Sequence, residues 1–438
     1  MFEVRQKPEM VRSAYLVGVY LDRRDELEAA SLLDELGELV DTLGVSAAAR
    51  ELVLVRDQNK AFLTGSGKKD EIIETARGLG CDCIIFDNQL TPLQQRNWER
   101  DADLTVIDRE EVILDIFAMR AHTREARLQV DLARMQYALP RMARMWGHLD
   151  RQRGGAGGGK GGGAATRGEG EKQIEVDRRL ARERINRARR ELEDVLKQRA
   201  TQRKERERSP IPHAAIVGYT NAGKSTLLNV LSGSDVLVED MLFATLDPTT
   251  RRIELPDGQA LLLTDTVGFV RNLPHKLVQA FKATLEESIL ADFLIHIVDA
   301  SAPAAERFYE TTCHVLSELG AEDKRSIVVL NKIDQVTNEA ALHKLRQTFP
   351  GAILVSLRNG TGLEELLHAI NDVLRDRVQR MNLRIPQARG DLIHQLHRDG
   401  KVVSEAYEGN DVLLSAIVPK PVRHLFETYE VGEVPNGS

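Results

Sequence analysis

The hydrophobic residues in the first quarter of the chain alternate between two periods. Residues 14–21 (AYLVGVYL) are almost continuously apolar, which indicates a buried strand, and residues 25–43 place their leucines at helical spacing. Short apolar runs at 83–86 and 104–107 predict two further strands. Strands that alternate with helices favour a largely parallel sheet. Residues 1–119 are therefore predicted to form a small α/β domain of the nucleotide-binding kind.

From residue 120 the apolar residues follow one face of a long helix. Spacings of four and three residues connect Leu128, Leu132, Met135, Leu139, Met142 and Trp146. Pro140 lies inside this pattern and is expected to kink or divide the helix. Residues 171–208 also have helical spacing, so residues 120–208 are predicted to form an antiparallel helical hairpin. The connecting loop, 151–171, is rich in glycine and has no apolar anchor.

The remaining chain returns to alternating strands and helices. Apolar strands are predicted at 214–217, 260–263, 293–298 and 326–330, and a further strand ends within 353–358. Residues 209–380 are thus expected to form a doubly wound α/β domain. The helix that follows Thr361 has the spacing of a capping box. The tail, 381–438, combines a helical stretch at 391–398 with a strand at 412–418 and is predicted to be a small α+β domain.

The third region opens with a phosphate-binding motif. The strand at 214–217 leads into Gly218, four residues, then Gly223, Lys224 and Ser225, and a helical pattern follows. Glycines let the backbone N–H groups and the helix N-terminus face a diphosphate. Lys224 would contact the β- and γ-phosphates, and the Ser225 hydroxyl would ligate Mg²⁺.

Further polar motifs stand at the ends of the later strands, where ligands bind in doubly wound sheets. Asp265 ends one strand and would hold the metal through water, and the N–H of Gly268 would meet the γ-phosphate. Asp334 could accept hydrogen bonds from both N1–H and the 2-amino group of guanine, whereas adenine presents the opposite pattern. Lys332 would lie along the base, Asn331 would brace the loop, and the loop 356–358 would contact the guanine oxygen. The order of these motifs predicts a GTP-binding domain.

The composition narrows the class of protein further. The 438 residues are 29% charged and 5% aromatic, and three cysteines favour a reducing compartment over a disulfide scaffold. No apolar run is long enough to cross a bilayer, and the N-terminus lacks the apolar core of a signal peptide. We expect a cytoplasmic protein without a membrane span.

The hairpin region carries a local positive charge. Residues 120–208 hold 24 Lys and Arg against 13 Asp and Glu, whereas the whole chain has a net charge of −7. One interpretation is a flexible linker between solvated helices. The other is an RNA-probing tip, in which glycines allow close approach to phosphates and Arg151, Arg153, Lys160 and Arg167 neutralise them.

Three other patterns are not expected to bind a ligand of their own. The segment 64–71 (TGSGKKDE) imitates a phosphate loop, but Phe62 and Lys69 stand where the motif needs glycine and Ser or Thr. A strand-to-helix turn is predicted there instead. The cysteines Cys81 and Cys83 lack a second pair, and the histidines His394 and His397 lack a third ligand, so neither pair predicts a metal site.

The segment 243–251 (FATLDPTTR), together with the motif at Thr166–Glu171 (TRGEGE) and the order of the domains, resembles the HflX family of the Obg–HflX group, within the translation-factor class of P-loop GTPases. The resemblance implies that Ser225 and Thr245 ligate Mg²⁺. It also implies a phosphate loop formed by Gly218, Tyr219, Thr220, Asn221, Ala222, Gly223, Lys224 and Ser225, and a switch I formed by Phe243, Ala244, Thr245, Leu246 and Asp247. Switch II would be formed by Asp265, Thr266, Val267 and Gly268. The base site would be formed by Asn331, Lys332, Ile333, Asp334, Ser356, Leu357 and Arg358.

The same resemblance implies a function and a partner. The family associates with the large ribosomal subunit and splits stalled ribosomes under stress, with the hairpin loop 151–171 reaching toward the rRNA of the peptidyl-transferase centre. This chain departs from the family pattern in that loop, which has extra glycines, Lys160, and Glu169 where proline is usual. We expect a monomeric GTPase in which Lys224, Thr245 and Gly268 serve catalysis.

Two alternatives remain open at this stage. One is a GTPase that assembles the large subunit and never acts on intact ribosomes. The other is a nucleotide-gated adaptor in which residues 120–208 and the N-terminal domain bind RNA or a protein, and turnover is incidental. Phe269 follows the switch II glycine, where many small GTPases have a glutamine that orients water. Because Phe269 cannot form a hydrogen bond through its side chain, slow intrinsic hydrolysis is predicted.

Overall fold

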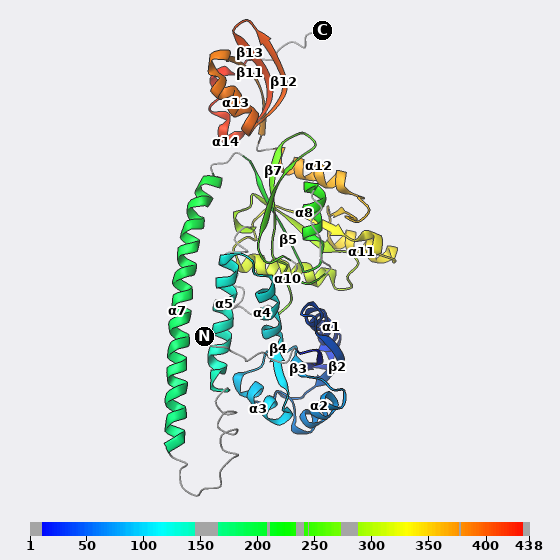
Figure 1. The fold of residues 1–438 in the computed structure, drawn as a ribbon. Coiled ribbons are helices and arrows are strands. Elements are labelled where there is room, and N and C mark those ends of the chain that lie inside the picture. Colours follow the sequence, from blue (N-terminus) through cyan, green and yellow to red (C-terminus); the bar gives the residue numbers. More distant parts are fainter. Residues whose placement is uncertain are drawn as a thin grey trace. The chain divides into compact units, whose positions relative to one another are not determined.

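The computed structural model forms two compact units (Figure 1). The first unit contains residues 1–195, 241–243 and 271–281, and the second contains residues 196–240, 244–270 and 282–438. The structure describes residues 11–144, 165–207, 211–233, 241–243, 245–272, 288–375 and 378–431. None of the helices in these ranges is long and apolar enough to span a membrane.

The first unit is built on a parallel four-stranded sheet in the order β2-β1-β3-β4. The strands are β1 (Ser13–Tyr20), β2 (Ser46–Leu54), β3 (Cys83–Phe86) and β4 (Thr105–Asp108). The predicted parallel α/β domain is confirmed. The sequence analysis missed β2, whose residues SAAARELVL alternate between exposed and half-buried because the strand lies at an edge of the sheet.

Helices follow the strands of this sheet and build its core. They are α1 (Glu26–Thr42), α2 (Ser66–Gly78), α3 (Pro92–Ala102) and α4 (Arg109–Arg120). The imitation phosphate loop leads into α2, but the predicted strand before it is absent from these described residues, because β2 ends at Leu54 and residues 55–65 form a loop with an isolated bridge between Asn59 and Leu63. Its two lysines form ion pairs within the unit, Lys68 with Glu51 and Glu71, and Lys69 with Asp101 at 2.7 Å.

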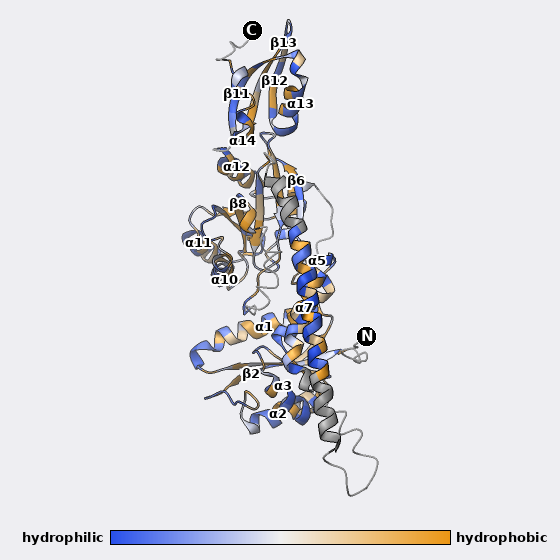
Figure 2. Ribbon diagram, turned by 90° about the vertical axis from the view of Figure 1, so that its left-hand side faces the viewer, coloured by the Kyte–Doolittle hydropathy of each residue, from blue (hydrophilic) through white to orange (hydrophobic). Residues whose placement is uncertain are grey.

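The hairpin region consists of α5 (Arg124–Ala138), the 3₁₀ segment η2 (Leu139–Arg144) and α7 (Ala165–Glu207). Pro140 divides the first helix, as predicted, because α5 ends two residues before it. Leu132 of α5 packs on Ile185 and Ala188 of α7, and Figure 2 shows such hydrophobic positions interrupting an otherwise hydrophilic α7. One prediction is wrong: residues 165–171 are helical and not part of the loop, while residues 151–164 and Trp146 lie outside the described residues.

The second unit contains a six-stranded sheet in the order β10-β9-β8-β5-β7-β6. All neighbours are parallel except β6 and β7. The strands are β5 (His213–Gly218), β6 (Thr249–Glu254), β7 (Ala260–Asp265), β8 (Phe293–Asp299), β9 (Ser326–Asn331) and β10 (Ile353–Leu354). The helices are α8 (Lys224–Ser232), α10 (Ala305–Glu318), α11 (Glu339–Thr348) and α12 (Leu363–Leu374).

This sheet confirms the predicted doubly wound fold, with β5 at the point where the strand order reverses. The sequence analysis missed β6, an edge strand with only Ile253 buried. The predicted capping box at Thr361 is wrong. The N-cap of α12 is Gly362, at φ 76°, and it makes no side-chain cap hydrogen bond.

The end of the chain forms a separate antiparallel sheet in the order β11-β13-β12. It comprises β11 (Val378–Pro386), β12 (Lys401–Glu408) and β13 (Asp411–Pro419), with α13 (Gly390–Asp399) and α14 (Lys420–Arg423). The short 3₁₀ segments elsewhere are η1 (Arg23–Asp25), η3 (Ile333–Gln335), η5 (Gln387–Arg389) and η6 (Glu427–Tyr429). The α+β tail is thus confirmed, whereas the division at 1–119, 120–208, 209–380 and 381–438 stays a prediction.

Candidate nucleotide-binding site

The phosphate loop connects β5 to α8 at the reversal point of the six-stranded sheet. Gly218 leaves β5 at φ 152°, and a Cβ there would lie 2.3 Å from the carbonyl oxygen of Ile297, so only glycine fits. Gly223 is the N-cap of α8, which has no side-chain cap. The first N–H groups of α8 are therefore available to an anion.

Lys224 is buried next to this loop, with only 6% of its surface exposed. Its Nζ donates a hydrogen bond to the carbonyl oxygen of Tyr219 at 2.7 Å. Burial lowers the pKa of Lys224 to about 8, and the nearby carboxylate of Asp265 opposes this shift. A buried ammonium that donates to a neutral carbonyl oxygen suits a site that receives negative charge.

Three oxygen-bearing side chains from separate segments converge beside Lys224. The Ser225 hydroxyl donates to Asp265 Oδ2 at 2.6 Å, Thr245 Oγ1 donates to the same oxygen at 2.9 Å, and the two hydroxyls lie 2.9 Å apart. The other carboxylate oxygen, Oδ1 of Asp265, is buried without a hydrogen-bond partner among the described residues. Burial also raises the pKa of the Asp265 carboxyl. This set of hard oxygen donors fits Mg²⁺.

Switch II leaves β7 directly against the phosphate loop. The Thr266 hydroxyl donates to the carbonyl oxygen of Ile216 at 2.6 Å. A Cβ on Gly268 would lie 2.7 Å from Thr220 Cγ2 and 3.0 Å from Lys224 Nζ, so the glycine backbone lies close to both. The N–H of Thr220 donates to the carbonyl oxygen of Phe269 at 2.8 Å, and the Phe269 ring is buried. Val267 is also buried.

Switch I is divided between the two units. Thr245 belongs to the second unit and joins Ser225 and Asp265, as described above. Leu246 is buried and Asp247 half-buried in that unit. Phe243 belongs to the first unit, where its ring packs on Phe117, and Ala244 lies outside the described residues.

The predicted base-site residues also lie together. Asn331 Nδ2 donates to the carbonyl oxygen of Ala222 at 2.8 Å, and its Oδ1 accepts from the N–H of Leu357 at 3.3 Å, so it braces both loops. The Ser356 hydroxyl donates to Asp334 Oδ1 at 2.6 Å. Asn221 has a φ of 58°, Ile333 begins η3, and Arg358 is exposed.

The ion pair of Lys332 identifies a residue that the sequence analysis missed, Asp299. Lys332 Nζ forms an ion pair with Asp299 at 2.7 Å, and this contact would hold the aliphatic stem of Lys332 in place beside a base. Asp299 is the last residue of β8. Because the predicted strand ended at 298, the rule that ligand-binding residues follow strand ends would have selected Asp299.

Three features of this site define the P-loop GTPases. They are a phosphate loop at the reversal point of the sheet, an adjoining cluster of hydroxyls and a carboxylate, and an acidic base loop. Residues 213–332 match the family model described as 50S ribosome-binding GTPase. Residues 30–118 match the model of the GTP-binding GTPase N-terminal region, and residues 120–206 match its middle region.

Individual relatives agree with these matches. The chain is 59% identical to GTPase HflX of Akkermansia muciniphila, over 98% of this chain and 99% of the relative, and 39% identical to GTPase HflX of Escherichia coli over 93% of each. A solved GTP-binding protein of Sulfolobus solfataricus in complex with GDP is similar at 25% identity and a TM-score of 0.43, over 83% and 99% of the two chains. The chain belongs to the HflX family, and it binds guanine nucleotides and hydrolyses GTP.

Proposed function

We propose that this protein binds the large ribosomal subunit in its GTP-bound state, splits stalled ribosomes under stress, and is released by GTP hydrolysis. The family description of residues 213–332 names the 50S ribosome as a ligand, which supports this partner. The protein would act as a cytoplasmic monomer. Splitting would use the difference in affinity for separated and intact ribosomes, because a ligand shifts an equilibrium only through such a difference.

The roles proposed for the site residues follow from the convergence of Ser225, Thr245 and Asp265. Ser225 and Thr245 would hold Mg²⁺ directly and Asp265 through water, and the ion would neutralise charge on the β- and γ-phosphates. Residues 218–225 would surround the phosphates. Lys224 and the N–H of Gly268 would contact the γ-phosphate, which lets the site distinguish GTP from GDP.

The base site would select guanine through Asp334. Its carboxylate can accept from N1–H and from the 2-amino group together, and Ser356 already fixes its orientation. Asn331 would hold the phosphate loop and the loop 356–358 in a common position. Lys332, held by Asp299, would cover one face of the base.

The hairpin supplies a surface suited to rRNA. Exposed arginines follow one another along the described part of α7, namely Arg179, Arg182, Arg184, Arg187, Arg189 and Arg190. A dense row of guanidinium groups favours contact with a phosphate backbone. We propose that the arms direct the loop 151–164 toward the large subunit.

Deleting residues 154–163 tests the contribution of the loop. We expect the variant to lose ribosome splitting while its hydrolysis of GTP in the absence of ribosomes is unchanged. A variant of full length with Arg151→Gln, Arg153→Gln and Lys160→Gln separates the charge of the loop from its reach. Normal splitting by the deletion variant would contradict this role and favour the interpretation of the loop as a linker.

A further inference from the structure

Both switch segments pass from one compact unit to the other within a few residues. Phe243 belongs to the first unit and Thr245 to the second. Likewise Gly268 belongs to the second unit and Arg271 to the first. Two peptide units span at most about 7 Å, and three at most about 11 Å. Fixing Phe243 and Arg271 therefore restricts where Thr245 and Gly268 can lie.

Phe243 is held in the first unit by aromatic packing. Its ring meets Phe117 of α4 edge to face, with centroids 4.7 Å apart, and only 2% of the residue is exposed. The backbone of Phe243 has a φ of 55°, a conformation unfavourable for a bulky residue. Such strain persists only where the surroundings offset it, and burial of the ring does so here.

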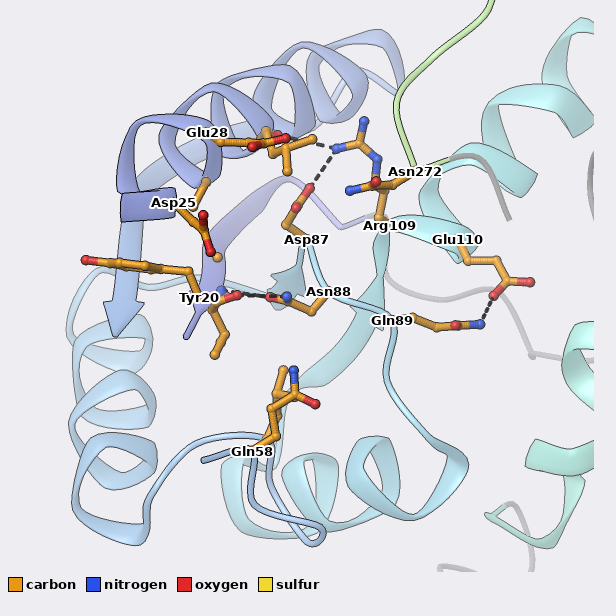
Figure 3. Close-up of a pocket in the computed structure, with 15 residues that line it drawn as sticks. Tyr20, Asp25, Glu28, Gln58, Asp87, Asn88, Gln89, Arg109, Glu110 and Asn272 are labelled. Atoms are coloured by element: carbon orange, nitrogen blue, oxygen red, sulfur yellow. Dashed lines mark hydrogen bonds and ion pairs between the residues drawn. The ribbon is translucent and has the colours of Figure 1, made fainter. Parts of the chain in front are cut away.

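Arg271 is held by a buried ion-pair network. Its Nε donates to Glu35 Oε2 at 3.0 Å, and Nη2 donates to the hydroxyl and carbonyl oxygens of Ser31, both at 3.0 Å. Glu35 also pairs with Arg109, which pairs with Asp87 at 2.6 Å. Figure 3 shows the Arg109–Asp87 pair in a cavity of about 600 Å³ that Asn272, the residue after Arg271, also lines.

The two carboxylates and two guanidinium groups of these pairs are all more than nine-tenths buried. Glu35 is the central group because it contacts both arginines. Neutralising Glu35 would remove the carboxylate that pairs with the buried guanidinium of Arg271, and breaking such a buried pair is strongly destabilising. The first unit would then hold Arg271 less firmly.

Phe243 and Arg271 belong to the first unit, and Thr245 and Gly268, close to them in the chain, belong to the nucleotide site of the second unit. Within that unit Thr245 lies within hydrogen-bond distance of Ser225 and Asp265, and the backbone of Gly268 lies close to Lys224. We propose that Glu35 and Phe117 are positioning residues for GTP binding: through Arg271 and Phe243 they favour the switch arrangement that binds the γ-phosphate and Mg²⁺. This inference rests on the proposed roles of Thr245 and Gly268 and is independent of ribosome splitting.

The test compares the affinities of a non-hydrolysable GTP analogue and of GDP for the full chain, without ribosomes. Glu35→Gln and Phe117→Leu are each expected to weaken analogue binding at least fivefold while GDP binding changes less than twofold. The double variant Phe117→Leu/Phe243→Leu should lose no more affinity for the analogue than the more strongly affected of its two single variants, because both substitutions remove the same contact. Matched controls in the same domain are Asp101→Asn, which breaks the Lys69 pair, and Phe86→Leu, which alters the core beside Trp98.

The proposal would be overturned if the variants lost analogue and GDP affinity equally, lost neither, or gained analogue affinity. The same selective loss in the control variants would also overturn it. The unmodified protein offers a second test that does not depend on the variants folding. Because coupling is reciprocal, amides of residues 31–42 and 112–121 should exchange more slowly with the analogue bound than with GDP bound. Equal exchange in the two states would also overturn the proposal.

Discussion

At the scale of single residues, the ammonium group of Lys224 is already buried away from water before any nucleotide binds. Burial lowers its pKa to about 8, Asp265 is its acidic neighbour, and the nearby His296 is neutral because burial lowers its pKa to about 3. Phosphate oxygens would stabilise the ammonium form and raise its pKa again. Binding of GTP should therefore be coupled to uptake of a proton above pH 8.

This coupling predicts a loss of affinity at alkaline pH. Between pH 7 and pH 9 the free protein changes from mostly protonated to mostly neutral at Lys224, so the dissociation constant for GTP should rise roughly tenfold. Isothermal titration calorimetry at pH 8.5, in two buffers of different ionisation enthalpy, measures the proton uptake directly. A dissociation constant that is constant from pH 7 to pH 9 would show that Lys224 is protonated throughout.

Asp334 provides a prediction about specificity. Asp334→Asn keeps one acceptor for N1–H but offers an amide N–H₂ toward position 2, where xanthine has an oxygen and guanine an amino group. GTP affinity should fall roughly 100-fold and xanthosine triphosphate should become the preferred ligand. A competition assay with both nucleotides measures the change, and the exposed Asp323→Asn in the same domain is the control. Unchanged preference for GTP would exclude Asp334 from base recognition.

Phe269 leads to a prediction about the rate of GTP hydrolysis. Its ring is 1% exposed and its backbone bonds to the phosphate loop, so the residue packs the switch and does not present a group to water. Intrinsic turnover should be slow, and Phe269→Gln should destabilise the domain without creating a fast enzyme, because a buried amide needs partners. A single-turnover assay measures the rate of GTP hydrolysis, and a thermal melt measures the stability of the domain. Rapid turnover by the unmodified protein, or faster turnover by the Phe269→Gln variant, would contradict this view.

At the scale of elements, the seam between α5 and α7 depends on few apolar contacts. Ile185 is buried against Leu132, whereas Val176 on the same helix is 39% exposed. Ile185→Ala should cost about 2–4 kcal/mol of local stability, and Val176→Ala under about 0.5 kcal/mol. Hydrogen exchange of α5 and α7 in the full chain reports the difference. Equal effects of the two substitutions would mean that the seam does not hold the helices together.

The sequence predicted elements wherever burial dictated the residue pattern. The central strands β1, β5 and β8 are almost continuously apolar because both faces are covered. The edge strands β2 and β6 were missed because one face or both meet water and their composition becomes mixed. The start of α7 was placed too late because glycine and charged residues at 165–171 carry no apolar period.

The site was predictable to the extent that it is local in sequence. Glycines and polar residues that follow strands identified the phosphate loop, switch II and the base loops. Glu35, Phe117 and Arg271 carried no such signal, since an acid, an aromatic and an arginine in amphipathic surroundings are ordinary. Only the fold brings Glu35 of α1 to Arg271, 236 residues away in the sequence.

At the scale of the whole molecule, the GTPase site is one of several parts that a nucleotide-driven cycle would have to coordinate. In the proposed mechanism the site would distinguish GTP from GDP through Thr245 and Gly268, whose near neighbours in the sequence, Phe243 and Arg271, belong to the first unit. The hairpin, which would contact rRNA, belongs largely to that same unit. Engagement of the ribosome is therefore expected to depend on the γ-phosphate and not on its hydrolysis.

Light scattering of intact ribosomes mixed with this protein and a non-hydrolysable GTP analogue tests that expectation most directly. The account predicts a loss of scattering with the analogue and none with GDP, which would assign splitting to binding and hydrolysis to release. No loss with the analogue, while the protein still co-sediments with free large subunits, would contradict the account and favour a role in subunit assembly.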